Sequence, residues 1–170
     1  MLSFTKKTEY ALISLCYLAD EPARTISARE IAEAYRMPTA LVMNILKTLH
    51  HSGLISSTRG TKGGYRLQAD LSEVSLRRLI GILEGPVRLA ECVEPGCQTT
   101  PGALEEPCKI ASGCPIQGPI QALHAKLVSF LDEVNVADLV VSGQRIDVPL
   151  GRVGTRKEAS PDLYCCPVTA

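Results

Sequence analysis

The sequence predicts a mainly α-helical fold with one small pair of β-strands. Aromatic residues are scarce, with five Tyr, two Phe and no Trp among 170 residues, so the core must be built mainly from Leu, Ile, Val and Ala. This composition favours helices over an aromatic-rich β-sandwich. Apolar residues recur at helical spacing in most segments, and the period changes only near residues 54–67. No apolar run approaches the ~18–20 residues that a membrane-spanning helix needs.

Three helices are predicted in the first part of the chain. Thr5 can cap a helix over residues 5–21, which Glu21-Pro22 ends. Ser27-Ala-Arg-Glu30 has the pattern of a capping box and predicts a short helix over residues 27–35. A third helix opens at Pro38 or Thr39 and continues to residue 51, before Ser52-Gly53. The short gap between the second and third helices is typical of a helix-turn-helix.

A strand, a cationic turn and a second strand follow. Leu54-Ile-Ser-Ser-Thr58 is rich in β-branched and hydroxyl residues, Arg59-Gly-Thr-Lys-Gly-Gly64 is a glycine-rich turn, and Tyr65-Arg-Leu67 alternates again. This order directly after a helix-turn-helix predicts a winged helix-turn-helix. A further helix over residues 75–84 is expected to pack against the core, and Gly85-Pro86 ends it.

The second half of the chain predicts a long loop, a long helix and a tail. Residues 86–118 are rich in Pro and Gly and keep no regular period, which is typical of a loop that is disordered or organised by something bound to it. Pro119 is expected to begin the longest helix, a dimerisation helix, because its apolar stripe needs a partner and a homodimer is the simplest one. The stripe consists of Ile120, Leu123, Leu127, Phe130 or Leu131, and Val134. Asn135 can cap a closing helix over residues 136–141.

We therefore divide the chain into four parts. Residues 1–85 form a winged helix-turn-helix domain, 86–118 a cysteine-rich loop, 119–141 the dimerisation helix and closing helix, and 142–170 a flexible tail. Charge differs between the parts, although Lys+Arg and Asp+Glu are both 18. Residues 34–69 contain five Lys or Arg and no Asp or Glu, which prepares this segment for an anionic partner.

The seven cysteines are an odd number, which does not fit a secreted disulfide framework. The apolar stretch over residues 10–19 imitates a signal peptide, but Glu9 precedes it directly and no small-residue cleavage site follows. We therefore expect a cytoplasmic protein. In that compartment thiols stay reduced, and clustered thiols bind metal or take part in redox chemistry.

The helix over residues 39–51 has the features of a recognition helix for double-stranded DNA. Its N-terminal positions, which would face the major groove, hold Thr39, Ala40, Met43 and Asn44. Asn44 can bind adenine with two hydrogen bonds, and Ala40 and Met43 can contact thymine methyl groups. Lys47, and beyond it His50 and His51, can meet phosphates. The alternative is a solvated face of an amphipathic helix, and the absence of carboxylates over residues 34–69 favours DNA.

The glycine-rich turn predicts a second set of DNA contacts. Arg59 can enter a narrow minor groove, and Lys62 and Arg66 suit phosphates. The glycines of this turn would let the backbone approach a phosphate chain closely. A nucleotide-binding loop is the alternative. Against it, the turn matches neither a P-loop nor a dinucleotide fingerprint, and it joins two strands instead of opening a helix.

Four cysteines in the loop are spaced to converge on a soft metal centre. They are Cys92, Cys97, Cys108 and Cys114, separated by four, ten and five residues. Structural zinc prefers closer pairs, which the first pair fits only at the limit and the last pair does not fit. An iron–sulfur cluster tolerates wider spacing because its irons are separated. Free cysteines in a mobile loop are the remaining interpretation. Cys16 is expected to be an ordinary core residue.

Several segments together carry a family resemblance. They are Thr8-Glu-Tyr-Ala-Leu12, the wing over residues 53–65, the cysteine loop and Val136-Ala-Asp-Leu139. Over about residues 1–141 the chain resembles the IscR/NsrR family of bacterial iron–sulfur transcription regulators. The resemblance implies a homodimer that binds promoter DNA and holds a 2Fe–2S or 4Fe–4S cluster through three loop cysteines. It also implies that the cluster senses redox state, nitric oxide or iron–sulfur status.

The resemblance leaves the fourth cluster ligand open, because this chain has four loop cysteines where the family usually has three. The gap between Cys92 and Cys97 matches the nitric-oxide-sensing branch, whereas a set without Cys97 has the commoner wide first gap. Gln117 stands where some members have a histidine ligand, and Glu9 stands where the nitric-oxide branch has an aspartate. The fourth ligand is then Cys97 or Glu9 across the dimer, although a carboxylate at a helix start is also favoured by the helix dipole.

We therefore expect a DNA-binding transcriptional regulator, a repressor, whose promoter affinity an iron–sulfur cluster controls. No membrane and no small-molecule substrate is expected among its partners. The alternatives are a cluster-free regulator that senses oxidants through its thiols and a zinc-binding winged-helix protein. An iron–sulfur or zinc enzyme or electron carrier is a further one, but the sequence offers no conspicuous Ser/His/Asp or paired-carboxylate site. Cluster type, signal, operator and the roles of Cys165 and Cys166 stay open.

Overall fold

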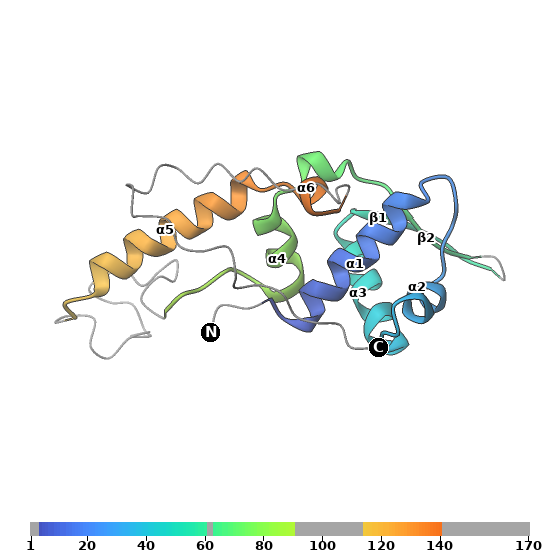
Figure 1. The fold of residues 1–170 in the computed structure, drawn as a ribbon, viewed down its shortest axis with the longest axis horizontal. Helices are drawn as coiled ribbons and strands as arrows, with labels where there is room; N and C mark the ends of the chain where they lie inside the picture. Colours follow the sequence, from blue (N-terminus) through green and yellow to red (C-terminus); the bar gives the residue numbers. More distant parts are fainter. Residues whose placement is uncertain (1–3, 61–62, 91–113, 141–170) are drawn as a thin grey trace, which may run out of the picture.

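The computed structural model describes residues 4–60, 63–90 and 114–140. Its helices are α1 (Lys6–Asp20), α2 (Ala28–Ala34), α3 (Thr39–His51), α4 (Leu76–Glu84), α5 (Gln117–Glu133) and α6 (Val136–Val140). Two strands, β1 (Ile55–Thr58) and β2 (Gly64–Leu67), and a 3₁₀ turn, η1 (Leu71–Glu73), complete the described elements. Figure 1 shows a head that contains α1 to α4 and the sheet, with α5 running away from it. The predicted winged helix-turn-helix with a long additional helix is thus confirmed.

Hydroxyl side chains set the start of three helices. Thr5 Oγ1 accepts a hydrogen bond from the Thr8 N–H (3.4 Å), Ser27 Oγ from the Glu30 N–H (3.1 Å), and Ser75 Oγ from the Arg78 N–H (3.2 Å). Each bond satisfies one of the N–H groups that the first turn of a helix leaves without a partner. The helices predicted to begin at residues 5, 27 and 75 therefore begin within one residue of those positions.

The end of α3 also follows from local chemistry. Gly53 has a φ of +80°, which a residue without a Cβ adopts at low cost. The Gly53 N–H donates to the His50 carbonyl (3.0 Å) and the Leu54 N–H to the Leu49 carbonyl (3.1 Å). These two bonds are the Schellman pattern, which satisfies the last helical carbonyls and turns the chain into β1.

The core of the head consists of aliphatic side chains from every helix of that region. Leu15 and Leu18 of α1, Ile45 and Leu46 of α3, and Leu79 of α4 are at most 1% exposed. The helix α1 packs against α3, α4, α6 and β2, so it lies in the middle of the head (Figure 1). A core of Leu, Ile, Val and Ala matches the prediction from composition, and no buried side-chain polar atom among the described residues lacks a partner.

The wing is a two-stranded antiparallel sheet in which Ile55 pairs with Leu67 and Thr58 with Gly64. A single residue of the α1–α2 connection extends it. Ile26 and Tyr65 exchange two backbone hydrogen bonds, of 2.9 and 2.7 Å. A Cβ at Gly64 would collide with the Ile26 carbonyl oxygen, and one at Gly63 with the Thr58 carbonyl oxygen. The packing of the chain's own backbone therefore requires these two glycines, independently of the predicted contact with DNA.

The helix α5 begins two residues before the predicted start at Pro119. Proline is tolerated there because the N–H groups of the first helical turn need no intrahelical partner. The predicted boundary between residues 118 and 119 thus falls inside α5. The closing helix α6 is present, but the contact at its start differs from the predicted cap: the Asp138 carboxylate accepts from the Asn135 backbone N–H (3.2 Å).

The C-terminal end of α5 is attached firmly to the head. The Leu76 N–H donates to the Val134 carbonyl, and the Val136 N–H donates to the Val74 carbonyl, both at 2.8 Å. Asp132 accepts from Arg77 Nη1 (2.5 Å) and from the hydroxyl of Ser75 (3.3 Å). Backbone and side-chain bonds together fix the direction in which α5 leaves the head. Within the described ranges, none of the helices is both long and apolar enough to cross a membrane.

Candidate nucleic-acid interface

One face of α3 packs against the core, and the face predicted to contact DNA bases is exposed to solvent. Val42, Ile45, Leu46 and Leu49 are fully buried. The predicted contact residues are all exposed, and these are Thr39, Ala40, Met43, Asn44 and Lys47. The side chain of Met43 is 42% exposed, although it is large and apolar. The structure thus brings the predicted α3 residues together on one surface.

The N-terminus of α3 differs from those of the other head helices. Its N-cap position is Pro38, and no side chain caps the helix within the described residues. In α1, α2 and α4 the hydroxyl of the N-cap residue pairs with the third N–H of the helix, whereas in α3 that N–H, of Leu41, donates to the Pro38 carbonyl (3.0 Å) and no hydroxyl of the described residues pairs with the first turn. Unpaired N–H groups and the positive end of the helix dipole favour an anion at this end.

Arg36, in the turn between α2 and α3, has a backbone conformation that no local sequence pattern predicts. Its φ is +52°, so it lies in the left-handed region, where a residue with a Cβ pays roughly 1–2 kcal/mol. Its side chain is exposed. The only sequence signal was its charge within the acid-free segment 34–69. A strained, exposed arginine beside α3 adds a cation to this surface.

His50, one of the predicted phosphate contacts, is exposed and forms two hydrogen bonds with residues of β1. The Ile55 carbonyl accepts from His50 Nδ1 (3.0 Å), which leaves Nε2 to accept from the Ser57 hydroxyl (3.1 Å). The imidazole thus joins the end of α3 to β1. His51, the next residue, is exposed and remains on the solvent side.

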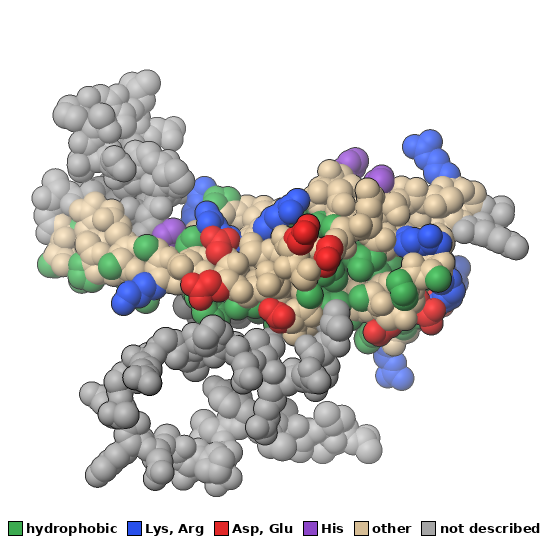
Figure 2. Space-filling view, turned by 90° about the horizontal axis from the view of Figure 1, so that it is seen from above, with side chains coloured by type: hydrophobic (Ala, Val, Ile, Leu, Met, Phe, Trp, Pro, Cys, Tyr) green, Lys and Arg blue, Asp and Glu red, His purple; other side chains and the backbone are tan. Residues whose placement is uncertain are grey.

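The wing carries the second predicted set of cations. Arg59 is exposed at the end of β1, whereas Lys62 lies outside the described residues. Arg66 is exposed, but its Nη2 donates to the Ala23 carbonyl (2.7 Å), so part of this guanidinium holds the wing against the α1–α2 connection. Figure 2 shows Lys and Arg side chains standing out from the end of the molecule that carries the wing.

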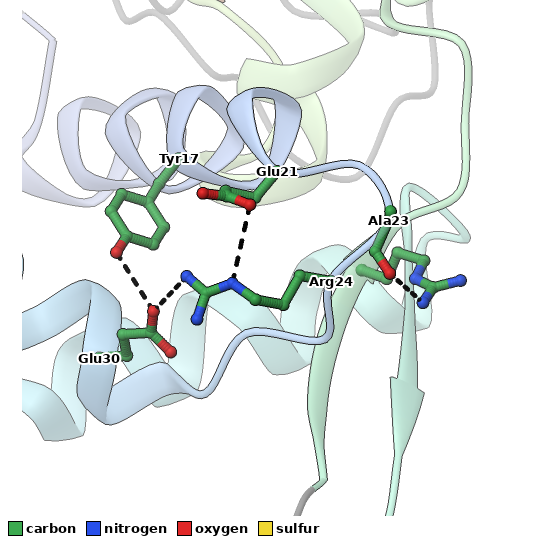
Figure 3. Close-up of polar contacts among 6 residues, drawn as sticks. Tyr17, Glu21, Ala23, Arg24 and Glu30 are labelled. Carbon is green, nitrogen blue, oxygen red and sulfur yellow. Dashed lines mark hydrogen bonds and ion pairs between the residues drawn. The ribbon is translucent and has the colours of Figure 1, made fainter.

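A polar cluster fixes the α1–α2 connection behind the wing. Glu30 accepts from Arg24 Nη2 (2.6 Å) and from the Tyr17 hydroxyl (3.2 Å), as Figure 3 shows. The hydrogen bond with Glu30 raises the pKa of Arg24. In the predicted capping box Glu30 would bond back to the Ser27 N–H, but its carboxylate is engaged by this cluster. Arg24, whose side chain is 48% exposed, is thus engaged by a carboxylate of its own chain.

Two of the predicted cluster ligands lie in described regions. Glu9 forms an ion pair with Lys6 (2.6 Å) and its side chain is 40% exposed. Cys114 is half-buried directly before α5, where its carbonyl accepts from the Gln117 N–H (3.4 Å). Cys92, Cys97 and Cys108 lie outside the described residues, and within the described part of one chain no three His, Cys, Asp or Glu side chains form a metal-binding group.

A set of bonds that the sequence did not predict joins the start of α1 to the end of α4. The hydroxyls of Thr5 and Thr8 both donate to Glu84 Oε1, and Lys7 Nζ donates to the Leu83 carbonyl. Thr8 is completely buried. Glu9 is thereby held next to the point where the chain leaves α4 toward the cysteine loop. Nearly 80 residues separate the partners, so no local pattern could reveal them.

The chain matches a family model over residues 4–142, and that model is described as Rrf2, an iron-dependent transcriptional regulator. One relative, the protein aau3 of Rhizobium meliloti, is 29% identical over 150 residues, which cover 88% of this chain and 92% of the relative. The HTH-type transcriptional regulator NsrR of Shouchella clausii is 26% identical over 142 residues, with 83% and 90% covered.

Solved structures of similar fold are also regulators. The crystal structure of Staphylococcus aureus CymR superposes with a TM-score of 0.55 at 26% identity and covers 78% of this chain and 93% of that one. An oxidized form of the same protein gives a TM-score of 0.56 at 25% identity, covering 79% and 93%. IscR of T. potens gives 0.59 at 19% identity, covering 84% and 89%, which supports the fold alone. The named relatives and neighbours of known role are transcriptional regulators and not enzymes.

Proposed function

Because the chain belongs to the Rrf2 family of transcriptional regulators, whose members bind DNA, we propose that it represses promoters as a homodimer under the control of an iron–sulfur cluster. In this proposal the head at residues 1–85 binds DNA, 86–118 hold the cluster, 119–141 form the dimer contact, and 142–170 are a tail. The observation that carries the proposal is the exposed cationic surface of α3 and the wing, which lies in a segment without any carboxylate.

The DNA contacts follow from the exposed residues of that surface. The N-terminal turn of α3 would enter the major groove, where Asn44 pairs with adenine and Ala40 and Met43 contact thymine methyl groups. Lys47 and the uncapped N–H groups of α3 would bind phosphates. Arg59 would reach the minor groove, with Lys62 and the remaining donors of Arg66 on the adjacent phosphates.

The dimer contact is proposed along the outer face of α5. Ile116 extends the predicted stripe by one position, so that apolar residues stand alternately four and three residues apart from 116 to 134. This is the spacing of a coiled-coil seam. The side chains of Ile116, Leu123 and Phe130 are 59%, 54% and 36% exposed in the single chain. Leu131, the other candidate at the stripe's fourth position, is only 7% exposed and packs inward.

The cluster would be held by Cys92, Cys108 and Cys114, with Cys97 or the partner's Glu9 as the fourth ligand. The donor set fits the group, because thiolates are the ligands that iron–sulfur clusters prefer. Cys114 and Glu9, the described candidates, are both partly accessible to solvent. A bound cluster would supply a centre that changes with redox state or nitric oxide. The bonds from Thr5 and Thr8 to Glu84 hold the start of α1, which carries the candidate ligand Glu9, against the end of α4.

The experiment that tests this proposal combines iron chemistry with DNA binding. Protein purified without oxygen should be coloured, absorb through sulfide-to-iron charge transfer and contain iron and acid-labile sulfide. Arg59→Ala should weaken binding to an operator duplex and keep the colour, whereas Cys108→Ala should lose the colour and its control of DNA binding. Colourless protein with stoichiometric zinc would contradict the iron–sulfur cluster but not the proposed binding of DNA.

A second candidate function is a regulator that senses oxidants directly through its thiols. It is supported by the likeness to S. aureus CymR, whose structures include an oxidized form. In this case purified protein contains neither iron nor sulfide. Its DNA affinity would change on treatment with peroxide and return on reduction, because a thiolate oxidises reversibly to a sulfenic acid or disulfide.

A further inference from the structure

A cleft of about 490 Å³ lies between α4, the segment after it and α5. Its walls include Arg77, Arg78 and Gly81 of α4, Val87 and Arg88 of the following segment, and Val128 of α5. Leu76, Leu79 and Leu83 of α4 are buried in the core, so the cleft lies on another face of this helix. Its volume is in the range of sites that bind small molecules.

Because Gly81 has no side chain, the cleft stays open, but the same glycine makes the helix α4 less stable. It stands in the middle of the helix with ordinary helical geometry, where glycine is less stable than alanine by roughly 0.8–1 kcal/mol. Among the described residues nothing lies within 4 Å of the position that a Cβ would take. No close approach of another segment therefore explains the missing side chain. The space above Gly81 is the cleft itself.

The described lining of the cleft contains three arginines and one carboxylate, that of Asp132. This carboxylate is already engaged by Arg77 and Ser75. The guanidinium of Arg78 has no hydrogen-bonding or ionic partner in the described part of the chain. Only the backbone N–H of Arg78 forms a hydrogen bond, which it donates to the Ser75 hydroxyl. His124 stays on the wall, where its Nε2 donates to the Val87 carbonyl (2.9 Å). The guanidinium group of an arginine, with its paired N–H donors, binds carboxylate or phosphate oxygens.

We propose that this cleft binds a small organic anion, with a phosphate or carboxylate group on Arg78 and an apolar part between Val87 and Val128. The ligand would touch both the head and α5. It would therefore favour one angle between them and change the affinity for DNA. The regulatory part of the inference rests on the proposed function, whereas binding itself does not.

The binding test uses the full-length protein without DNA, titrated with phenyl phosphate by calorimetry. We expect saturable binding of one molecule per chain, and inorganic phosphate should bind at least about tenfold more weakly because it has no apolar part. Arg78→Gln should weaken binding of phenyl phosphate at least about tenfold. Gly81→Leu should abolish binding by filling the cleft, while its unchanged circular dichroism shows that the chain still folds.

Arg29→Gln is the matched control, because Arg29 is an exposed arginine of α2 that pairs with Glu33. It should leave the affinity for phenyl phosphate unchanged. Binding that survives both Arg78→Gln and Gly81→Leu, or no saturable binding, would overturn the site, and equal affinity for inorganic phosphate would overturn the role of the apolar wall.

The regulatory test measures fluorescence anisotropy on a duplex selected by the protein from a random pool. Saturating phenyl phosphate should shift its affinity several-fold in the parent protein and not in Gly81→Leu. Binding without any shift would overturn the regulatory part alone. Failure of the protein to select any duplex would instead contradict the proposed function.

Discussion

Gly64 and Gly81 both stand in regular structure, but they lack a side chain for opposite reasons. At Gly64 the strand passes so close to Ile26 that a Cβ would meet its carbonyl oxygen, whereas at Gly81 a Cβ would meet open space. Alanine at position 64 should lower the free energy of unfolding by about 1–3 kcal/mol, through forced separation of the two segments. Alanine at position 81 should raise it by up to about 1 kcal/mol.

Denaturant unfolding of both variants checks the pair. The two substitutions add the same methyl group, so each is the control of the other. A stable Gly64→Ala protein would mean that Ile26 does not join the sheet.

Arg59 is the residue at which DNA binding is tested most directly. Its side chain is exposed, so we expect Arg59→Ala to fold normally, to reduce operator affinity by about tenfold and to make this affinity less dependent on salt. Anisotropy titrations over a series of salt concentrations measure both effects. Arg29→Ala, on α2, is the matched loss of one charge, and an equal loss of affinity there would contradict a specific contact by the wing.

Cys16 is expected to be an unreactive thiol. Burial raises its pKa above 9.0, and the nearby charge of Asp20 adds to the effect. Less thiolate is present near pH 8, so iodoacetamide should modify Cys16 more slowly than a free cysteine. Because the folded pKa is the higher one, the contribution of the neutral thiol to stability is complete below pH 9 and is lost as the pH rises through the folded value. Denaturation of Cys16→Ala across this range should lack that loss, and rapid modification of Cys16 at pH 8 would contradict the assignment.

Individual residues could be predicted from the sequence where local patterns decide them. The exposed positions on α3 and the half-buried Cys16 follow from helical periodicity. The conformation of Arg36 and the bonds of Glu84 with two threonines could not be predicted, because the first is a strained exception and the second joins residues far apart in the chain.

At the level of elements, prediction succeeded because each helix carries its own start and stop signals. Thr5, Ser27 and Ser75 cap three helices, and Gly53 ends α3. It was less accurate for α5, whose first turn contains Pro119 without a hydroxyl cap, so two extra residues join the helix. The close approach of Gly64 to Ile26 could not be predicted, because Ile26 gives no sequence sign that it extends the sheet.

The apolar face of α5 gives a prediction at this scale. Leu123→Glu places a charge in the proposed seam, so the dimer should dissociate into monomers at concentrations where the parent remains dimeric. Ala125→Glu is the matched control, since Ala125 is also exposed but lies on the opposite side of the helix from Leu123. Light scattering after size-exclusion chromatography gives the masses. A parent protein that is monomeric, or a dimeric Leu123→Glu variant, would contradict the proposed dimer contact.

At the level of the whole molecule, the sequence revealed the separation of charge but not the cleft. Counting residues suffices to show a basic first half and an acidic second half. The cleft is formed only when α5 returns to pack on α4, which brings residues near 80 together with residues near 128. In the sequence, Arg78, which we propose to bind the ligand, is indistinguishable from a residue on an ordinary solvated helix face.

The bonds between Val74, Leu76, Val134 and Val136 have a mechanical consequence. They attach the head to the C-terminal end of α5, so that the head and α5 rotate together as one rigid unit. With 17 residues, α5 is an arm of about 25 Å, so a tilt of about 10° around its far end displaces the head by about 4 Å. Successive base pairs are stacked about 3.4 Å apart, so a tilt of about 8° at the pivot would shift α3 by one base pair along the DNA half-site that we propose it binds.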